Sequence, residues 1–351
     1  MHNVRLLAAA SVLVVAAGAA PAQAQTLTYS LFERYLESLR EQAGIPGLSA
    51  AIVQDGSVAW ERGLGRQDVE GNVPASPDTP YYIGDVSQTM GAALVLRKCL
   101  EQDTLELSDR VTRWVPDYPD DDARVSNLLT HTTNSGEFEY SLDRFAGLTS
   151  VIVECADQSY GHVLYDEVFN RFGMQNSVPG TSFTGPASPG TVPFDSGTST
   201  RFADVMRRAA VTYRLSGGRA VRSEVTPPAL SAATGVLSTV RDLARYDMAL
   251  QSGALIETQS LTASWTQAVV QGRALRTGLG WFVQNYNGEP LIWQFGLIRD
   301  GHSALVLKLP RRNLTLIMLA NSDAMTSGYN LNNGDVTTSP FATLFLRFFV
   351  P

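Results

Sequence analysis

Hydrophobic residues recur at helical spacing early in the chain, at Phe32, Tyr35, Leu36 and Leu39. This period predicts an amphipathic helix over residues 29–42, because side chains three or four positions apart share one face of a helix. A Gly-Ile-Pro sequence follows and is expected to end the helix.

A pair of strands is expected next. Residues 48–53 and 57–61 are β-rich runs separated by Asp55-Gly56. Asp-Gly readily adopts the positive φ angles of a two-residue type I′ turn, so the two runs predict a β-hairpin. Residues 64–80 are rich in turn-forming residues and predict irregular structure.

Helical patterns dominate the middle of the chain. Residues 86–100 predict a largely apolar helix, and Asp85 stands where the N-cap of that helix belongs. Residues 105–190 predict helices and loops with little strand character. Residues 178–202, rich in Gly, Pro, Ser and Thr, predict a surface connection long enough to cover a neighbouring cleft.

The last third of the chain begins with one more helix and then returns to strand patterns. The helix is expected to start near Asp242, since Thr239 and Asp242 resemble a capping box with Asp in place of Glu. Asn287-Gly288 supplies a second hairpin turn. Four strands and an apolar closing helix are expected at residues 279–284, 291–295, 303–309, 314–319 and 340–349.

This order of elements predicts an α/β protein of the α+β type. Strands from both ends of the chain would form one antiparallel sheet, with helices on its faces and a helical lobe beside it. We expect a single domain over residues 25–351, with a sheet lobe at about 25–80 and 230–351 and a helical lobe at about 81–229. With 44% hydrophobic residues, the chain can bury a core of that size.

The first 24 residues have the pattern of a secretory signal peptide. Arg5 gives a positive start, residues 6–20 are apolar, and Ala22-Gln23-Ala24 is a small-x-small cleavage sequence. The apolar run is too short to be a membrane span. The sequence therefore predicts export to a bacterial periplasm, or secretion, with no transmembrane anchor after cleavage.

The charge balance argues against two classes of partner. Of the 27 Lys and Arg residues, Arg5 leaves with the leader, so 26 stand against 34 Asp and Glu in the predicted mature chain, a formal charge of −8 (26 minus 34). Nucleic acids and acidic membrane surfaces both favour basic proteins, so neither is an expected partner.

Cysteine and histidine usage offers no metal site. The three histidines of the predicted mature chain, His131, His162 and His302, are scattered, and no Cys/His cluster has metal-ligand spacing. No metal or cofactor is expected. Cys99 and Cys155 are the only cysteines. Two states remain open for them: a disulfide, which an oxidising compartment permits, or two free thiols on the apolar faces of helices.

Several strings, in this order along the chain, resemble the β-lactamase-related serine hydrolases. That family includes class C β-lactamases, D-alanyl-D-alanine carboxypeptidases and esterases of the same fold. The resemblance covers nearly the whole predicted mature chain and implies the fold of the penicillin-binding proteins. The matching strings are Ile45-Pro46-Gly47, Tyr81-Tyr82-Ile83-Gly84, Leu128-Leu129-Thr130-His131-Thr132, Phe172-Gly173-Met174, residues 235–244 and Gly278-Leu279-Gly280-Trp281.

The resemblance places Asp85 and Gln88 at the positions of the family's catalytic serine and lysine. Residues three apart share a helix face, so a lysine there would lie beside the serine and help to deprotonate it. This chain reads Asp85-Val86-Ser87-Gln88 instead. A carboxylate cannot act as the alkoxide nucleophile, and an amide cannot accept the proton. We expect the family's standard mechanism to be absent.

Two other family motifs are also altered. Tyr140 matches the motif tyrosine of the helical lobe, with Leu142 where the family often has an amide. Gln294-Phe295-Gly296 resembles the strand motif that lines the family's site, with Gln294 in place of a titrating residue. Gly296 would keep backbone access for a ligand.

No other residue is expected to replace the missing pair. Ser87 lies on another helix face, and Met90 stands three residues beyond it. Lys98 is thirteen residues along the helix, roughly 20 Å from Asp85 at about 1.5 Å per residue. Lys308 is near the far end of a strand. His302 is expected in a turn or on the surface, and less readily in the cleft.

Three functions remain open on the sequence. The first is a catalytically degenerate relative with a binding or vestigial role. The second is an enzyme that uses Asp85 and Tyr140 as paired acid and base groups without an acyl-enzyme. The third is weak esterase- or amidase-type hydrolysis. An ionised Asp85 in place of serine, with lysine lost, would disfavour anionic ligands and favour small neutral or cationic ones.

Overall fold

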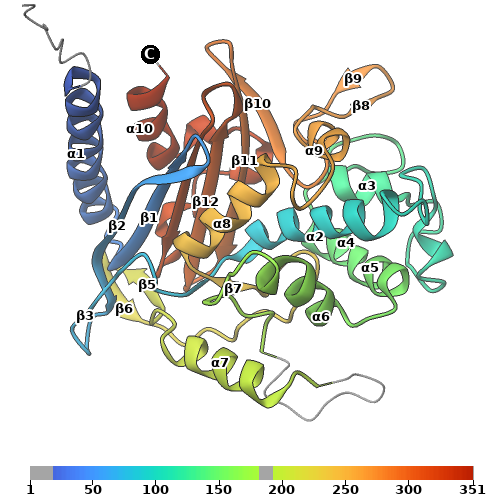
Figure 1. Cartoon of the computed structure of the whole chain (residues 1–351), viewed down its shortest axis with the longest axis horizontal. Coiled ribbons are helices and arrows are strands. Elements are labelled where there is room, and N and C mark those ends of the chain that lie inside the picture. The colour runs from blue at the N-terminus through green and yellow to red at the C-terminus, as the bar shows by residue number, and fades with distance from the viewer. Residues whose placement is uncertain (1–18, 182–192, 351) are drawn as a thin grey trace, which may run out of the picture.

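One antiparallel sheet brings the two ends of the chain together (Figure 1). The computed structural model describes residues 19–181 and 193–350. The seven strands, in spatial order, are β10 (Phe282–Tyr286), β11 (Glu289–Ile298), β12 (His302–Leu309), β13 (Leu314–Ala320), β1 (Gly47–Gln54), β2 (Ser57–Asp68) and β3 (Val73–Pro74). All neighbours pair antiparallel, which confirms the predicted α+β type and the sheet built from both chain ends.

The predicted hairpins form with the expected turns. Gln54 pairs with Ser57 across the β1–β2 turn. Asp55 and Gly56 at that turn have φ angles of 50° and 73°, the left-handed values that a type I′ turn requires. Asn287-Gly288 connects β10 to β11 in the same way, with Tyr286 paired to Glu289.

Two helices cover one face of the sheet. They are α1 (Ala19–Gln42) and α10 (Pro340–Phe349), and α10 has the predicted bounds. Phe32 of α1 packs edge-on against Phe345 of α10, with ring centroids 6.2 Å apart. The expected cleavage point after Ala24 falls within α1, and residues 1–18 of the predicted leader lie outside the described part of the chain.

Of the remaining α-helices, α8 (Val240–Gln251) packs on the other face of the sheet, against β1 and β13. Predicted helix 86–100 is divided into a short 3-10 turn, η1 (Gly84–Val86), then α2 (Ser87–Val95) and a π-helical turn, η2 (Leu96–Leu100). The others among the described residues are α3 (Val125–Thr130), α4 (Leu142–Ala146), α5 (Leu148–Ala156), α6 (Tyr160–Leu164), α7 (Ser196–Arg207) and α9 (Thr258–Ser264). A second π-helical turn, η4 (Tyr165–Asn170), continues α6.

Two parts of the middle region differ from the prediction. The expected surface connection 178–202 includes the first half of α7, where the Asp195 side chain accepts a hydrogen bond from Thr198 N at 3.0 Å and begins the helix. Its residues 182–192 lie outside the described residues. A small hairpin, β5 (Tyr213–Ser216) and β6 (Arg219–Arg222), lies within the segment predicted as helical. Gly217-Gly218 at its turn is the signal that was missed.

The two cysteines form a disulfide, the question that the sequence left open. Cys99 of η2 and Cys155 of α5 are bonded, with their Cα atoms 5.5 Å apart. Cys99 is completely buried. Packing of α5 against the helix that follows Asp85 brings the two side chains together, and a helical pattern alone cannot show which helices will be neighbours.

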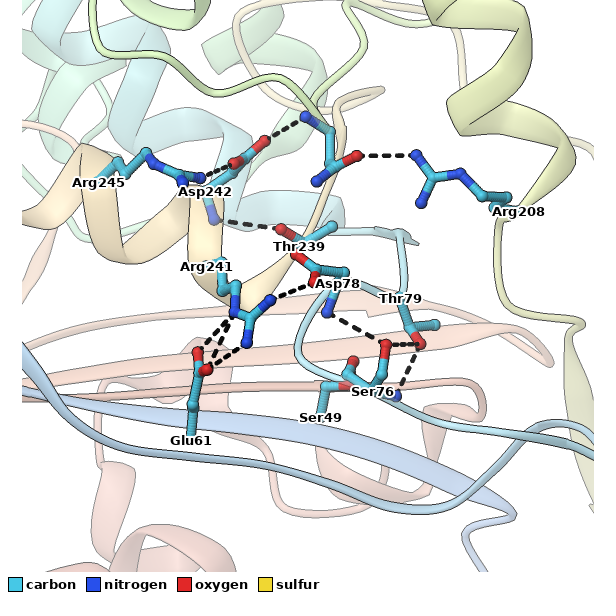
Figure 2. A network of polar contacts seen from close by, with 11 residues as sticks. Ser49, Glu61, Ser76, Asp78, Thr79, Arg208, Thr239, Arg241, Asp242 and Arg245 are labelled. Carbon is cyan, nitrogen blue, oxygen red and sulfur yellow. Dashed lines mark hydrogen bonds and ion pairs between the residues drawn. The ribbon is translucent and has the colours of Figure 1, made fainter.

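Helix α8 is fixed to the sheet by a polar network (Figure 2). Thr239 caps the helix through Asp242 N at 3.1 Å, as predicted. The Asp242 side chain does not complete the capping box, because it accepts hydrogen bonds from Asn176 N and from Ser177. Arg241 contacts Glu61 of β2 through Nε at 2.9 Å and also binds Asp78.

The backbone of β11 comes very close to η1. A Cβ atom on Gly296 would lie 2.0 Å from the Ile83 carbonyl oxygen. Gly84 has a φ angle of 54°, and a Cβ there would lie 2.9 Å from Leu297 N. Two glycines that face each other therefore allow the start of the α2 region to contact the strand.

We expect Gly296→Ala to destabilise the protein by about 3 kcal/mol, because the added methyl must push η1 away from β11. Gly161→Ala in α6 is the matched control, since the atom nearest to the added Cβ would be in the Leu230 side chain, at 3.5 Å. That variant should be neutral or up to about 1 kcal/mol more stable. Urea unfolding measures both, and equal stabilities would contradict the close contact.

Candidate functional site

The structure brings Asp85, Gln88 and Tyr140 into one hydrogen-bonded cluster. Asp85 lies in η1 and is 3% exposed. Tyr140 donates its hydroxyl proton to Asp85 Oδ2 at 2.8 Å. Leu297 N of β11 donates to Asp85 Oδ1 at 3.4 Å. The carboxylate therefore lies between the helical region and the sheet.

Asp85 is not the N-cap that the sequence predicted. No side chain caps η1 or α2, and Ile83, which precedes η1, has φ −87° and ψ 0°. An N-cap residue needs extended backbone angles so that its side chain can turn back to the first amides. Asp85 is instead the second residue of η1, and its carboxylate points toward Tyr140 and β11.

Gln88 is completely buried and uses both ends of its amide. Its Nε2 donates to the Tyr140 hydroxyl at 3.1 Å. Its Oε1 contacts His131 Nε2 at 2.9 Å and Gln294 Nε2 at 3.3 Å. Gln294, predicted from the strand motif, thus joins the cluster from β11.

His131 is a cluster member that the sequence analysis did not assign to the site. It follows α3 in the left-handed region, with φ 53°, and it is 3% exposed. Its ring stacks on Tyr140 with centroids 4.4 Å apart. The family-like string around it was a signal for fold only, and its contact with Gln88 depends on how two distant segments pack.

Aromatic rings enclose the Tyr140 side chain. Phe282 and Phe295 both stack on it at centroid distances of 5.6 Å. Phe295, which belongs to the strand motif expected to line the site, therefore packs against one side of the cluster, and Gly296 contacts η1. Leu142 is not brought into the cluster: it begins α4 and packs against the apolar core.

Burial controls the protonation of the cluster. Removal from water raises the pKa of Asp85 from 3.8 to about 6, although the hydrogen bonds from Tyr140 and from the backbone amides of Leu297 and Asp85 itself oppose the rise. Burial, and then the neighbouring Asp85 charge, raise the pKa of Tyr140 far above its usual value. Burial and then Arg144 lower the pKa of His131 to about 3. Tyr140 and His131 are thus neutral near pH 7, where Asp85 is mainly ionised.

Two alternative catalytic residues are engaged elsewhere, as expected. Ser87 Oγ donates to the Gly84 carbonyl at 2.7 Å and is completely buried. Lys98 pairs with Glu167 at 3.0 Å, on the far end of the helix.

Lys308 is held within the core. It is 2% exposed and forms an ion pair with Asp247 of α8. The Trp281 and Trp265 ring centroids lie 5.1 and 5.3 Å from its Nζ. Burial lowers the pKa of Lys308 to about 7.

His302 is neither in a turn nor on the surface, so that expectation is wrong. It is the first residue of β12, is 1% exposed, and stacks on Tyr82 at 5.8 Å. Tyr82 N donates to its Nδ1 at 3.2 Å. The strand begins one residue earlier than predicted, which places the ring beneath β4 (Tyr81–Tyr82).

Four surface grooves, of about 630, 500, 400 and 700 Å³, are lined by other residues than Asp85, Gln88 and Tyr140. Two of these grooves have lining residues close to the cluster in the chain: Tyr82 and Ile298 line the 500 Å³ groove, and Glu139, which precedes Tyr140, lines the 400 Å³ groove. Across residues 19–181 and 193–350, no group of three or more His, Cys, Asp or Glu side chains is arranged to hold a metal ion. No helix in the same described ranges is long and apolar enough to cross a membrane.

The sheet with helices on both faces, and a polar cluster where a buried helix meets a sheet strand, define a protein of the penicillin-binding-protein and β-lactamase fold. The chain belongs to the Beta-lactamase family, whose model matches residues 32–335.

Solved structures of this fold resemble the chain along most of its length. The octameric penicillin-binding protein homologue from Pyrococcus abyssi is 19% identical with a TM-score of 0.72, covering 91% of this chain and 77% of that one. The D-amino acid amidase from Ochrobactrum anthropi is 18% identical with a TM-score of 0.70, covering 91% and 99%. A class C beta lactamase from Rhodobacter sphaeroides is 18% identical with a TM-score of 0.65, covering 83% and 94%. At these identities the likeness shows the fold alone.

Curated relatives match more locally or more distantly. The human "Serine beta-lactamase-like protein LACTB, mitochondrial" is 33% identical over 85 residues, which are 24% of this chain and 15% of that protein. The putative penicillin-binding protein PbpX of Bacillus subtilis is 22% identical, covering 76% of this chain and 71% of its own length. Protein flp of Staphylococcus aureus is 23% identical, covering 82% and 62%. The match to the human protein thus spans only about a seventh of that protein's length.

The raised pKa of Asp85 predicts a specific dependence of stability on pH. A carboxyl group whose folded pKa exceeds its unfolded pKa binds more protons in the folded state, so stability falls as pH rises from about 4 to about 6. Asp85→Asn should remove up to about 3 kcal/mol of this fall. Chemical unfolding at several pH values measures this effect as the difference in unfolding free energy between wild type and variant. The contributions of the other titrating groups cancel in that difference.

Asp335→Asn is a control for which the opposite dependence of stability on pH is expected. Hydrogen bonds from Thr337 and Gln284 outweigh burial and lower the pKa of Asp335, so its stabilising contribution is lost as pH falls. A flat difference for Asp85→Asn across this pH range would show that the carboxyl is not buried as described.

Proposed function

We propose that the protein is an exported, non-hydrolytic member of the family that acts by binding a small ligand. The observation that carries this proposal is the side chain of Asp85. It occupies the junction of η1 and β11, and its carboxylate is already hydrogen-bonded to Tyr140 and to Leu297 N. A carboxylate held there leaves no hydroxyl to attack an ester or amide carbonyl.

The surroundings of Gln88 also support a loss of acyl transfer. Both ends of its amide are hydrogen-bonded inside the cluster, and an amide has no basic site at neutral pH. Ser87 and Lys98, the nearest residues of the required types along the helix, are bonded to other partners. The catalytic pair that the family uses is, on this proposal, replaced by a buried polar cluster.

An exported location is part of the proposal. The leader pattern of residues 1–24 supports it, and so does the Cys99–Cys155 disulfide, since disulfides persist mainly in oxidising compartments. Periplasm and exterior are both compatible with these two features.

The 500 Å³ groove is the proposed ligand site. Tyr82 and Ile298 line it, and each lies close in sequence to a cluster residue: Tyr82 precedes Asp85 by three positions, and Ile298 follows Leu297. The ionised Asp85 gives this region a negative charge, so we propose a neutral or cationic ligand. Glu224 and Arg222 both line the groove, so Glu224 adds a second carboxylate and Arg222 an opposing charge.

Active-site labelling tests the loss of acyl transfer. The wild-type protein should bind neither a fluorophosphonate probe nor a fluorescent penicillin covalently, because no activated serine is present. The double substitution Asp85→Ser/Gln88→Lys should restore labelling or hydrolysis of a chromogenic ester. Asp85→Ser alone is the matched control and should stay near background, since it lacks the base. Labelling of the wild type that Ser87→Ala abolishes would refute the proposal.

A second candidate function is acid–base catalysis without an acyl-enzyme. The observation that favours it is the Tyr140–Asp85 hydrogen bond together with the pKa of Asp85, raised to about 6 by burial, because a general base works best with a pKa near the working pH. On this alternative, Asp85 accepts a proton and Tyr140 orients the carboxylate.

Rate measurements with neutral and cationic esters and amides test this alternative. The rate should rise with pH through about 6 as Asp85 loses its proton, and Asp85→Asn should abolish it while the protein stays folded by circular dichroism. Turnover that survives Asp85→Asn would exclude the acid–base role.

A further inference from the structure

His131 occupies a place in the cluster from which it can control the orientation of a neighbouring amide. It is buried and reaches Gln88 Oε1 through Nε2 at 2.9 Å. On the other side of its ring, Ser141 N lies 3.2 Å from Nδ1. A backbone N–H can only donate, so Nδ1 must be the unprotonated acceptor, and the ring proton of the neutral imidazole is on Nε2.

This tautomer determines which way Gln88 faces. The Nε2–H of His131 needs an acceptor, and the Gln88 carbonyl oxygen is the one that it contacts. Gln294 adds a second donor on the same oxygen, at 3.3 Å. The orientation of Gln294 is itself determined, because Phe295 N donates to its Oε1 at 3.0 Å. Two donors on one oxygen leave the Gln88 NH₂ group directed at Tyr140.

The next steps follow from the same requirement that each donor meets an acceptor. Gln88 Nε2 donates to the Tyr140 oxygen, so the Tyr140 proton is free to point elsewhere. The acceptor that it meets is Asp85 Oδ2 at 2.8 Å. Each hydrogen bond in the series from His131 through Gln88 and Tyr140 therefore runs in one direction and ends on the carboxylate.

We propose that His131 is a positioning residue: it fixes the direction of the Gln88 amide, and through it directs the Tyr140 hydroxyl proton to Asp85 and keeps that buried carboxylate charged. If the amide were reversed, Gln88 would present its oxygen to Tyr140. The Tyr140 hydroxyl proton would then be shared between Gln88 and Asp85. Asp85 would then be less ionised near pH 7, and the site would discriminate less strongly against anionic ligands.

This role of His131 rests on the proposed function for the ligand site, and it does not depend on which ligand binds there. It also does not depend on whether any ester is hydrolysed, so its failure is distinguishable from that of the proposed function. The titratable and charged groups that face the series are few: Tyr140 for Asp85, and Arg144 for His131.

The test measures the titration of the Asp85 carboxyl by carbon NMR, with its signal assigned by its loss in Asp85→Asn. His131→Phe keeps a ring to stack on Tyr140 and Phe145 but removes the donor. It should move the titration midpoint of Asp85 to higher pH. His131→Phe/Gln294→Met, which removes both donors, should move it further, by about one pH unit, because a hydrogen bond to a charged group is weakened.

A second background distinguishes this role from a general structural one. In Gln88→Met the intermediate amide is absent, so adding His131→Phe should leave the Asp85 midpoint unchanged. An equal shift in both backgrounds would overturn the proposal, since His131 would then act on Asp85 without Gln88. An unchanged midpoint in the His131→Phe/Gln294→Met variant, with the protein folded, would also overturn it.

Discussion

The close approach of β11 to the turn before α2 is the constraint on which the polar cluster depends. Gly296 and Gly84 face each other there, and a Cβ on Gly296 would lie 2.0 Å from the Ile83 carbonyl oxygen. Because neither residue has a side chain, Leu297 N can reach the Asp85 carboxylate from the strand. Tyr140 reaches the same carboxylate from the helical side. One carboxylate therefore connects a strand of the sheet to the segment before α4, and its position follows from a backbone contact.

Beyond its N-terminal end, the helix that carries Asp85 and Gln88 is also fixed at its far end. The Cys99–Cys155 disulfide attaches η2 to α5, and Glu167 of η4 pairs with both Arg97 and Lys98. These contacts restrict the rotation of the helix, which keeps Gln88 facing His131 and Tyr140. A buried polar cluster is costly unless every donor finds its acceptor, so a rigid helix is a condition for its stability.

The same saturation of hydrogen bonds bears on function. A catalytic site needs at least one group that is free to exchange a proton or a bond with a substrate. In this cluster the amide of Gln88 and the hydroxyl of Tyr140 already have partners within the protein. Asp85 alone retains a property suited to chemistry, a pKa near neutrality, and burial is its cause. Binding beside the cluster is therefore easier to reconcile with this geometry than turnover within it.

The sequence by itself determined the elements that local rules govern: both hairpins with their Asp-Gly and Asn-Gly turns, the closing helix at residues 340–349, and, through family-like strings, the fold and the convergence of Asp85, Gln88, Tyr140 and Gln294. Tertiary structure decided the rest. His131 in the cluster, buried His302, the Lys308–Asp247 pair, the disulfide, and Asp85 as a bridge and not a cap all depend on which distant surfaces meet. Turn and helix preferences act over a few neighbouring residues, whereas burial and hydrogen-bond partners are set by contacts between segments far apart in the chain.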